Sequence, residues 1–344
     1  MNSIAVVGAA GPVGQSLLRR LAADPGVERL IGVDGSLPDV RPRGLEFHAV
    51  DPAEADLTAL LAGADGVVHL DLPAGSHDDG APGAVTVRRV LEAAGRTGVE
   101  AVVYTSSATV YGAWPTNPVP LTENAPVRPN PGFAYASEKA EAERLATEWR
   151  DMQEGVRLAV LRPVTVLGPG VDDWLARLFR DPPSVRVADA RPPLQYVHTD
   201  DVASAIEVAL RERLDGVFNV APDGWISGDD ARALTAGRLQ VVVPEALGRR
   251  LTALAWALGF GATPAEVVPY LVHPWVVAND RLRAAGWAPQ HTSEEAFVAG
   301  AGVPPWQSLS LGRRQAVGLG LAGAAMAAGV GGVVALTRRH RSRR

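Results

Sequence analysis

The sequence predicts an α/β protein built on a doubly wound parallel sheet, with a smaller C-terminal lobe after it. Short apolar runs alternate with amphipathic segments through the first two-thirds of the chain, and a glycine-rich turn follows the first run. Beyond about residue 167 this alternation weakens and proline-rich turns become common. The 344 residues, 47% of them hydrophobic, are enough for a large core and exclude a disordered chain.

The apolar runs are expected to be strands and the amphipathic segments helices. Strands are predicted at 4–7, 29–33, 45–50, 66–70, 101–105 and 157–161, and helices near 13–23, 84–97 and 135–150. The pattern divides the chain into a dinucleotide-binding domain (1–166), a substrate lobe (167–305) with some segments returning to the sheet, and a tail (306–344).

A glycine-rich turn joins the first strand to the first helix. The segment 8–14 has the spacing GxxGxxG, whereas the usual dinucleotide fingerprint is GxGxxG. Glycines let the backbone approach a pyrophosphate, whose charge then lies at the helix N-terminus. The turn therefore predicts a Rossmann-type dinucleotide site. Its candidate binding residues are Gly8, Gly11, Pro12, Val13 and Gly14.

Two acidic residues follow the next two strands. Asp34 ends the second strand, 20 residues beyond Gly14, where a carboxylate binds the ribose hydroxyls of the dinucleotide. The same carboxylate would repel a 2′-phosphate, which favours NAD over NADP. Asp51 closes the third strand, where it would reach the adenine edge. Both residues also suit an ordinary turn, since Asp34 precedes Gly35 and Asp51 precedes Pro52.

Tyr135 and Lys139 are four residues apart on a predicted helix, so both project from one face. A tyrosine with a pKa of about 10 is a poor acid/base at neutral pH unless a cation stabilises its phenolate. Lys139 is the only lysine among 33 basic residues, the others being arginine, and a compact ammonium suits this role. The alternative is a solvated lysine paired with Glu143.

The combination of motifs resembles the extended short-chain dehydrogenase/reductases, the NAD-dependent epimerase/dehydratase group, over roughly residues 3–300. The resemblance is carried by the segments 8–14, 106–112, 135–139, 161–170, 196–203, 218–221 and 286–289. It implies that Ser107 orients the substrate, that Tyr135 is the general acid/base and that Lys139 is its partner. It places Leu70 and Pro163 at the NAD site and implies a possible homodimer.

The sequence departs from that family at two informative positions. Asp71 follows the fourth strand where the family often has alanine, which puts an unexpected carboxylate near the cofactor. Leu194 stands where nucleotide-sugar epimerases commonly have an arginine that grips the substrate pyrophosphate. Leucine cannot replace that bidentate, charged contact.

These residues predict an NAD-dependent oxidoreductase or epimerase that moves a hydride at a secondary alcohol or ketone. The substrate is either a nucleotide sugar or a membrane-associated lipid, sterol or isoprenoid alcohol, which would suit Leu194. The alternative is a non-catalytic NAD(H)-binding sensor or scaffold at the membrane. The net charge of −5 argues against nucleic acid as a partner. The absence of cysteine and the scattered histidines give no metal site.

The C-terminal segment 316–336 is 21 residues without a charge, flanked by arginines. A helix of this length crosses a bilayer, so the segment is predicted to be a transmembrane anchor; the alternative is a flexible Gly/Ala tail. The heavier arginine cluster follows it, and the positive-inside rule would put the main domain outside. We nevertheless expect a cytoplasmic domain anchored to the membrane, because NAD is scarce outside, and the conflict over orientation stays open.

Overall fold

The computed structural model describes residues 1–72, 83–180, 185–187, 190–230, 241–244, 247, 250 and 265–300. Met1–Gly300 form one compact unit. Among the described residues, no helix is both long and apolar enough to cross a bilayer. The segment 316–336, in which a transmembrane helix is predicted, lies outside the described residues.

Seven parallel strands form the main sheet in the order β10-β6-β5-β4-β1-β2-β3. They are β1 (Ser3–Val7), β2 (Arg29–Asp34), β3 (Leu45–Ala49), β4 (Gly66–Leu70), β5 (Ala101–Thr105), β6 (Arg157–Pro163) and β10 (Gly216–Val220). The six strands predicted from sequence are present, and β10 is a seventh. The strand order reverses between β1 and β4, which is where ligands bind at the carboxyl edge of such sheets.

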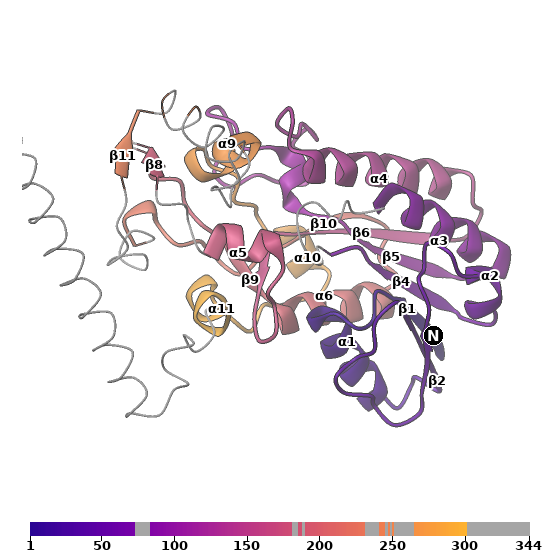
Figure 1. Cartoon of the computed structure of the whole chain (residues 1–344). Helices are drawn as coiled ribbons and strands as arrows, with labels where there is room; N and C mark the ends of the chain where they lie inside the picture. The colour runs from indigo at the N-terminus through magenta and orange to yellow at the C-terminus, as the bar shows by residue number, and fades with distance from the viewer. Residues whose placement is uncertain are drawn as a thin grey trace, which may run out of the picture. The chain divides into compact units, whose positions relative to one another are not determined.

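Helices cover both faces of this sheet, as Figure 1 shows with α3 and α4 above it and α1 and α6 below it. The helices are α1 (Pro12–Ala23), α2 (Leu57–Leu60), α3 (Gly83–Thr97), α4 (Ala134–Asp151), α5 (Trp174–Arg180), α6 (Thr199–Arg211), α9 (Val268–Val272), α10 (Asp280–Ala284) and α11 (Ser293–Gly300). The predicted doubly wound α/β fold is therefore confirmed. Two segments beyond residue 167, α6 and β10, belong to this layered core.

Alternate residues of each strand enter two separate hydrophobic cores. In β1, Val6 packs into the core that α1 and α6 cover, whereas Val7 packs into the core under α3 and α4. Both faces of the inner strands are buried, which explains their continuous apolar runs, whereas the edge strand β3 is only partly buried. The two cores hold the parallel strands in place, so the loops that follow the strands all begin at the carboxyl edge of the sheet.

Two short parallel pairs extend the lobe beyond this sheet. The pair β7 (Thr165–Leu167) and β9 (Tyr196–His198) follows directly from β6, and β8 (Val185–Val187) pairs with β11 (Val241–Val243). Because β7 begins two residues after Pro163, the lobe is attached at the carboxyl edge of the main sheet.

Candidate active site

The glycine turn after β1 is shaped by close backbone contacts. Gly8 has φ of +85°, and a Cβ there would lie 2.4 Å from the carbonyl oxygen of Leu70 at the end of β4. A Cβ on Gly14 would lie 2.6 Å from the carbonyl oxygen of Ala9. The turn thus packs tightly against β4 and the first turn of α1, which only glycine permits.

Gly11 is the N-cap of α1 and faces open space. A Cβ on Gly11 would meet no atom within 4 Å, and no side chain caps the helix. Pro12 occupies the first turn and Val13 follows it. The open helix N-terminus can therefore receive an anionic group on its backbone N–H groups, as a pyrophosphate requires.

The two predicted carboxylates differ in their surroundings. Asp34 ends β2 as expected, and its carboxylate accepts hydrogen bonds from the backbone N–H of Ala10 at 3.0 Å and of Ser36 at 2.9 Å. It thereby ties the end of β2 to the glycine turn. Asp51 lies two residues beyond the end of β3 and accepts a hydrogen bond from the N–H of Ala53 at 2.8 Å, which is the turn geometry. The tight turn, the open helix end and Asp34 fit a dinucleotide.

A substitution of Gly11 is expected to weaken cofactor binding without destabilising the fold. Gly11 has φ of −67°, which suits any residue, so Gly11→Val is expected to keep the melting temperature while weakening NAD binding at least about ten-fold. Gly8→Ala is the matched control, because its positive φ and 2.4 Å contact make it destabilising. Calorimetric titration with NAD and thermal unfolding measure both effects. Unchanged NAD affinity in Gly11→Val would show that the turn does not hold the cofactor.

Tyr135 and Lys139 lie one turn apart near the start of α4, and both are buried. Ser107 follows β5 and caps a 3₁₀ turn, Ala108–Tyr111, with its hydroxyl accepting from the backbone N–H of Thr109. The Ser107 hydroxyl also acts on the Tyr135 hydroxyl, whose pKa it lowers. The structure therefore brings together the three residues that the sequence indicates as catalytic.

Lys139 is paired with Asp71 and not with Glu143. Its Nζ lies 2.7 Å from Asp71 Oδ2 and also donates to the backbone carbonyl of Asp71. The Tyr104 hydroxyl donates to the same carboxylate at 3.2 Å. Glu143 instead pairs with Arg162. Sequence analysis singled out Asp71 only as a departure from the family, because a contact across 68 residues has no local signal.

Tyr135 is a neutral phenol in this environment. Burial raises its pKa well above the ordinary value, and the negative charges of Asp71 and Asp173 act in the same direction. The hydrogen bond with Ser107 lowers the pKa but does not offset them. Asp71 pairs with the Lys139 ammonium, so the stabilisation of a Tyr135 phenolate by Lys139 stays a prediction.

His69, near the end of β4, is buried and stacks on Tyr104, with the ring centroids 5.9 Å apart. Neither ring nitrogen has a hydrogen-bond partner. Burial lowers the pKa of His69 to about 4, although the Asp71 charge opposes this shift. The imidazole is therefore uncharged at neutral pH.

This histidine is expected to make stability pH-dependent. Between pH about 6.5 and 4 the unfolded chain binds a proton that the folded chain excludes, so the free energy of unfolding falls as the pH falls, by up to about 3 kcal/mol. Urea unfolding across this range should show a shallower dependence in His69→Phe, which keeps an aromatic ring on Tyr104. Identical pH dependence in both proteins would mean that His69 protonates freely in the folded state.

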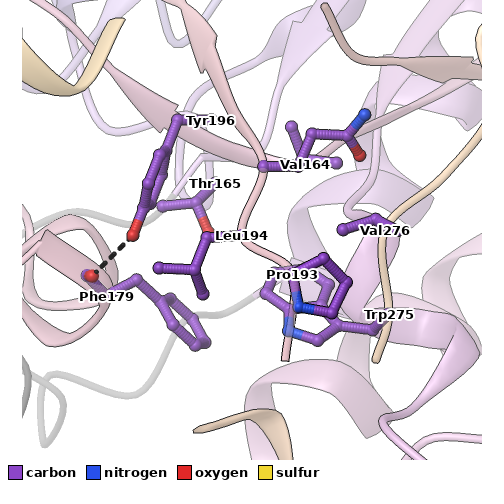
Figure 2. A pocket seen from close by; sticks show the side chains of 9 residues that line it. Val164, Thr165, Phe179, Pro193, Leu194, Tyr196, Trp275 and Val276 are labelled. Atoms are coloured by element: carbon purple, nitrogen blue, oxygen red, sulfur yellow. Dashed lines mark hydrogen bonds between the residues drawn. The ribbon is translucent and has the colours of Figure 1, made fainter. Parts of the chain in front are cut away.

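A small pocket opens beyond β6, next to Pro163, which ends that strand in a buried position. Figure 2 shows Leu194 there among apolar side chains, with the Tyr196 hydroxyl donating to the carbonyl of Phe179 at 3.0 Å. The lining residues are Val164, Thr165, Phe179, Pro193, Leu194, Gln195, Tyr196, Trp275 and Val276. No charged side chain is among them.

Aromatic rings connect this pocket to Tyr135. Trp174 packs edge-on against the Tyr135 ring with centroids 5.5 Å apart, and Phe133 lies 5.9 Å from the same ring. From Phe133 the contacts continue through Tyr270 to Trp275, whose ring is in the pocket wall. Sequence analysis missed Trp174, because its aromatic partner is 39 residues earlier in the chain. The surface around Tyr135 is thus apolar and aromatic.

Comparisons with known proteins agree with this geometry. The model of the NAD dependent epimerase/dehydratase family matches residues 4–221. An uncharacterized protein of Mycobacterium tuberculosis (strain H37Rv) is 28% identical over 310 residues, covering 86% of this chain and 82% of its own. N-acetyl-alpha-D-glucosaminyl-diphospho-ditrans,octacis-undecaprenol 4-epimerase of Escherichia coli O157:H7 is 31% identical over 175 residues, 48% of this chain and 50% of its own.

Solved structures of similar fold include nucleotide-sugar enzymes. MoeE5 in complex with UDP-glucuronic acid and NAD superposes with a TM-score of 0.67 at 22% identity, covering 86% of this chain and 97% of that one. The UDP-glucose 4-epimerase of Thermus thermophilus in complex with NAD gives 0.64 at 23% identity, covering 87% and 97%. At this identity the likeness concerns the fold.

Proposed function

Because this chain belongs to the NAD-dependent epimerase/dehydratase family, we propose that it oxidises or epimerises a secondary alcohol of a sugar carried on an isoprenoid diphosphate. The family makes it an NAD-dependent enzyme; the substrate is our proposal. The observation that carries the chemistry is that Ser107, which follows β5, acts on the buried hydroxyl of Tyr135, while Lys139 lies one helical turn further along α4. Bound NAD supplies the hydride acceptor and donor.

The residues of the chain divide the remaining work. Ser107 holds the substrate oxygen, and Tyr135 exchanges the hydroxyl proton with it. In the direction of reduction, the neutral phenol donates its proton to the ketone oxygen while the hydride reaches the carbon. In oxidation Tyr135 would first release its own proton to solvent, and the phenolate oxygen would then accept the substrate's hydroxyl proton; bound NAD would supply the hydride acceptor. The raised pKa keeps Tyr135 in the form that donates.

The substrate class rests on Leu194. Nucleotide-sugar epimerases of this family commonly have arginine at this position, whereas here an isobutyl group faces Phe179 and Trp275. Both candidate substrates carry a diphosphate, so the missing arginine does not distinguish them. The apolar wall favours a lipid chain over a nucleoside. The relative from Escherichia coli acts, by its name, on an undecaprenol-linked sugar, which supports this choice. The nucleotide-sugar enzymes of similar fold support the other candidate, a UDP-sugar.

The test is direct incubation of the full-length protein in detergent with NAD and two substrate panels, UDP-sugars and polyprenyl-diphosphate sugars. Tyr135→Phe is the matched control, and the products are read by mass spectrometry and NMR. Conversion of the polyprenyl sugars alone supports the proposal. Conversion of UDP-sugars replaces it with the second candidate. No Tyr135-dependent conversion, with NAD binding intact, would leave the NAD-binding sensor.

For localisation we propose a cytoplasmic domain anchored to the membrane through the segment 316–336. Membrane fractionation of the full chain and of a chain ended after residue 312 tests the anchor, which predicts that only the full chain sediments with membranes. A reporter fused after residue 344 distinguishes the two orientations. Light scattering of the shorter chain tests the homodimer that the family resemblance implies.

A further inference from the structure

The buried pair of Asp71 and Lys139 adds a charged group that the catalytic chemistry described above does not use. The Lys139 side chain is 4% exposed and that of Asp71 is 13% exposed. Two independent contacts hold the ammonium, one to the Asp71 carboxylate and one to its backbone carbonyl. Asp71 follows β4 directly, so the carboxylate sits at the carboxyl edge next to the point where the strand order reverses.

The charges around Lys139 can be accounted for group by group. Asp71 carries −1 and Lys139 carries +1, so the pair is neutral. Tyr104 donates its hydroxyl to Asp71 and stays uncharged, and His69 behind it is neutral. Tyr135, whose ring centroid lies 5.5 Å from the Lys139 ammonium, is also neutral. Glu143, one helical turn beyond Lys139, is compensated by Arg162. Glu138, the neighbour of Lys139 in the chain, also acts on the ammonium, but less strongly than Asp71.

Removing the carboxylate would leave an uncompensated cation at this edge. The oxidised nicotinamide ring carries a positive charge and the reduced ring carries none. With a dinucleotide bound at this edge, a lone Lys139 ammonium would oppose the oxidised form, whereas a neutral pair would not. Charges a few ångströms apart in a partly buried site change an equilibrium by about ten-fold or more.

We propose that Asp71 is a positioning residue that fixes Lys139 and cancels its charge. With a neutral residue at position 71, the preference of the protein for oxidised NAD over NADH would be weaker. The proposal rests on the NAD-dependent function given above. It gives a role to Asp71, which stands directly after β4 where the family often has alanine.

The test compares the affinities of the full chain for NAD and for NADH, without any substrate. In Asp71→Ala, the ratio of the dissociation constants of NAD and NADH is expected to rise about ten-fold. This corresponds to a rise of about 30 mV in the potential of the bound couple. NADH fluorescence and calorimetric titration with NAD give the two constants. Asp34→Asn is the matched control, because a ribose contact at the end of β2 should weaken both forms equally.

A second variant keeps the test decisive if Asp71→Ala folds poorly with its buried, unpaired lysine. Asp71→Ala combined with Lys139→Met removes both charges, and its ratio should equal that of the unsubstituted chain. The proposal is overturned if the ratio of the dissociation constants of NAD and NADH is unchanged in Asp71→Ala. It is also overturned if the double variant raises this ratio about ten-fold above that of the unsubstituted chain. If the unsubstituted chain binds neither form, the NAD-dependent function itself fails.

Discussion

Tyr135→Phe is expected to lower kcat by about 10²–10⁴-fold while leaving NAD affinity and the fold intact. The substitution removes one oxygen and keeps the ring that packs against Phe133 and Trp174. The lost hydroxyl belongs to a buried side chain, so solvent cannot replace it as proton donor. Initial rates at saturating substrate, with the dissociation constant of NAD measured separately, test this expectation.

Tyr270→Phe is the matched control for this experiment. Its side chain is also buried, and its hydroxyl donates to the backbone carbonyl of Thr109 at 2.8 Å and not to Ser107. This variant is expected to lose about 1 kcal/mol of stability and little activity. If Tyr135→Phe retained a kcat within ten-fold of the unsubstituted enzyme, another group would have to transfer the proton.

The parts of the fold that follow from short stretches of sequence were predictable. Buried parallel strands are continuous apolar runs, and the edge strand β3 alternates apolar with polar residues. These two patterns allowed six of the seven strands of the main sheet to be found within two residues of their ends. The strand β10 was missed as a strand because Gly216–Val220 contains Asn219 and lies where the alternation weakens. Its pairing with β6 is a contact between distant segments, which no local pattern encodes.

The same distinction applies to the site. The glycine turn and the spacing of Tyr135 and Lys139 are local, and the structure places these residues as the helix period requires. The partner of Lys139 was not predictable in this way. The i+4 spacing favoured Glu143, but the sheet brings Asp71 to the ammonium and leaves Glu143 facing β6. The partner of Lys139 matters for Tyr135, because the buried Lys139–Asp71 pair beside it has no net charge.

Breaking the buried pair of Glu143 and Arg162 is expected to cause the largest loss of stability. The Arg162 Nε lies 2.9 Å from Glu143 Oε1, and the two side chains are 5% and 8% exposed. Burial would lower the pKa of Arg162, but the hydrogen bonds and charge of Glu143 more than offset this. In Glu143→Gln the guanidinium stays charged without a counterion in the core. The free energy of unfolding should fall by about 3–5 kcal/mol.

Urea unfolding measures this loss as a lower midpoint with an unchanged slope. Glu141→Gln is the matched control on the same helix, because Glu141 pairs with Arg144 on the exposed surface and its midpoint should not move. Replacing the whole pair, as Glu143→Leu with Arg162→Met, should recover most of the loss, since no charge is then stranded. Equal midpoints for Glu143→Gln and Glu141→Gln would mean that water reaches the guanidinium. The anchoring of α4 to β6 would then depend on apolar packing alone, and the position of Tyr135 and Lys139 with it.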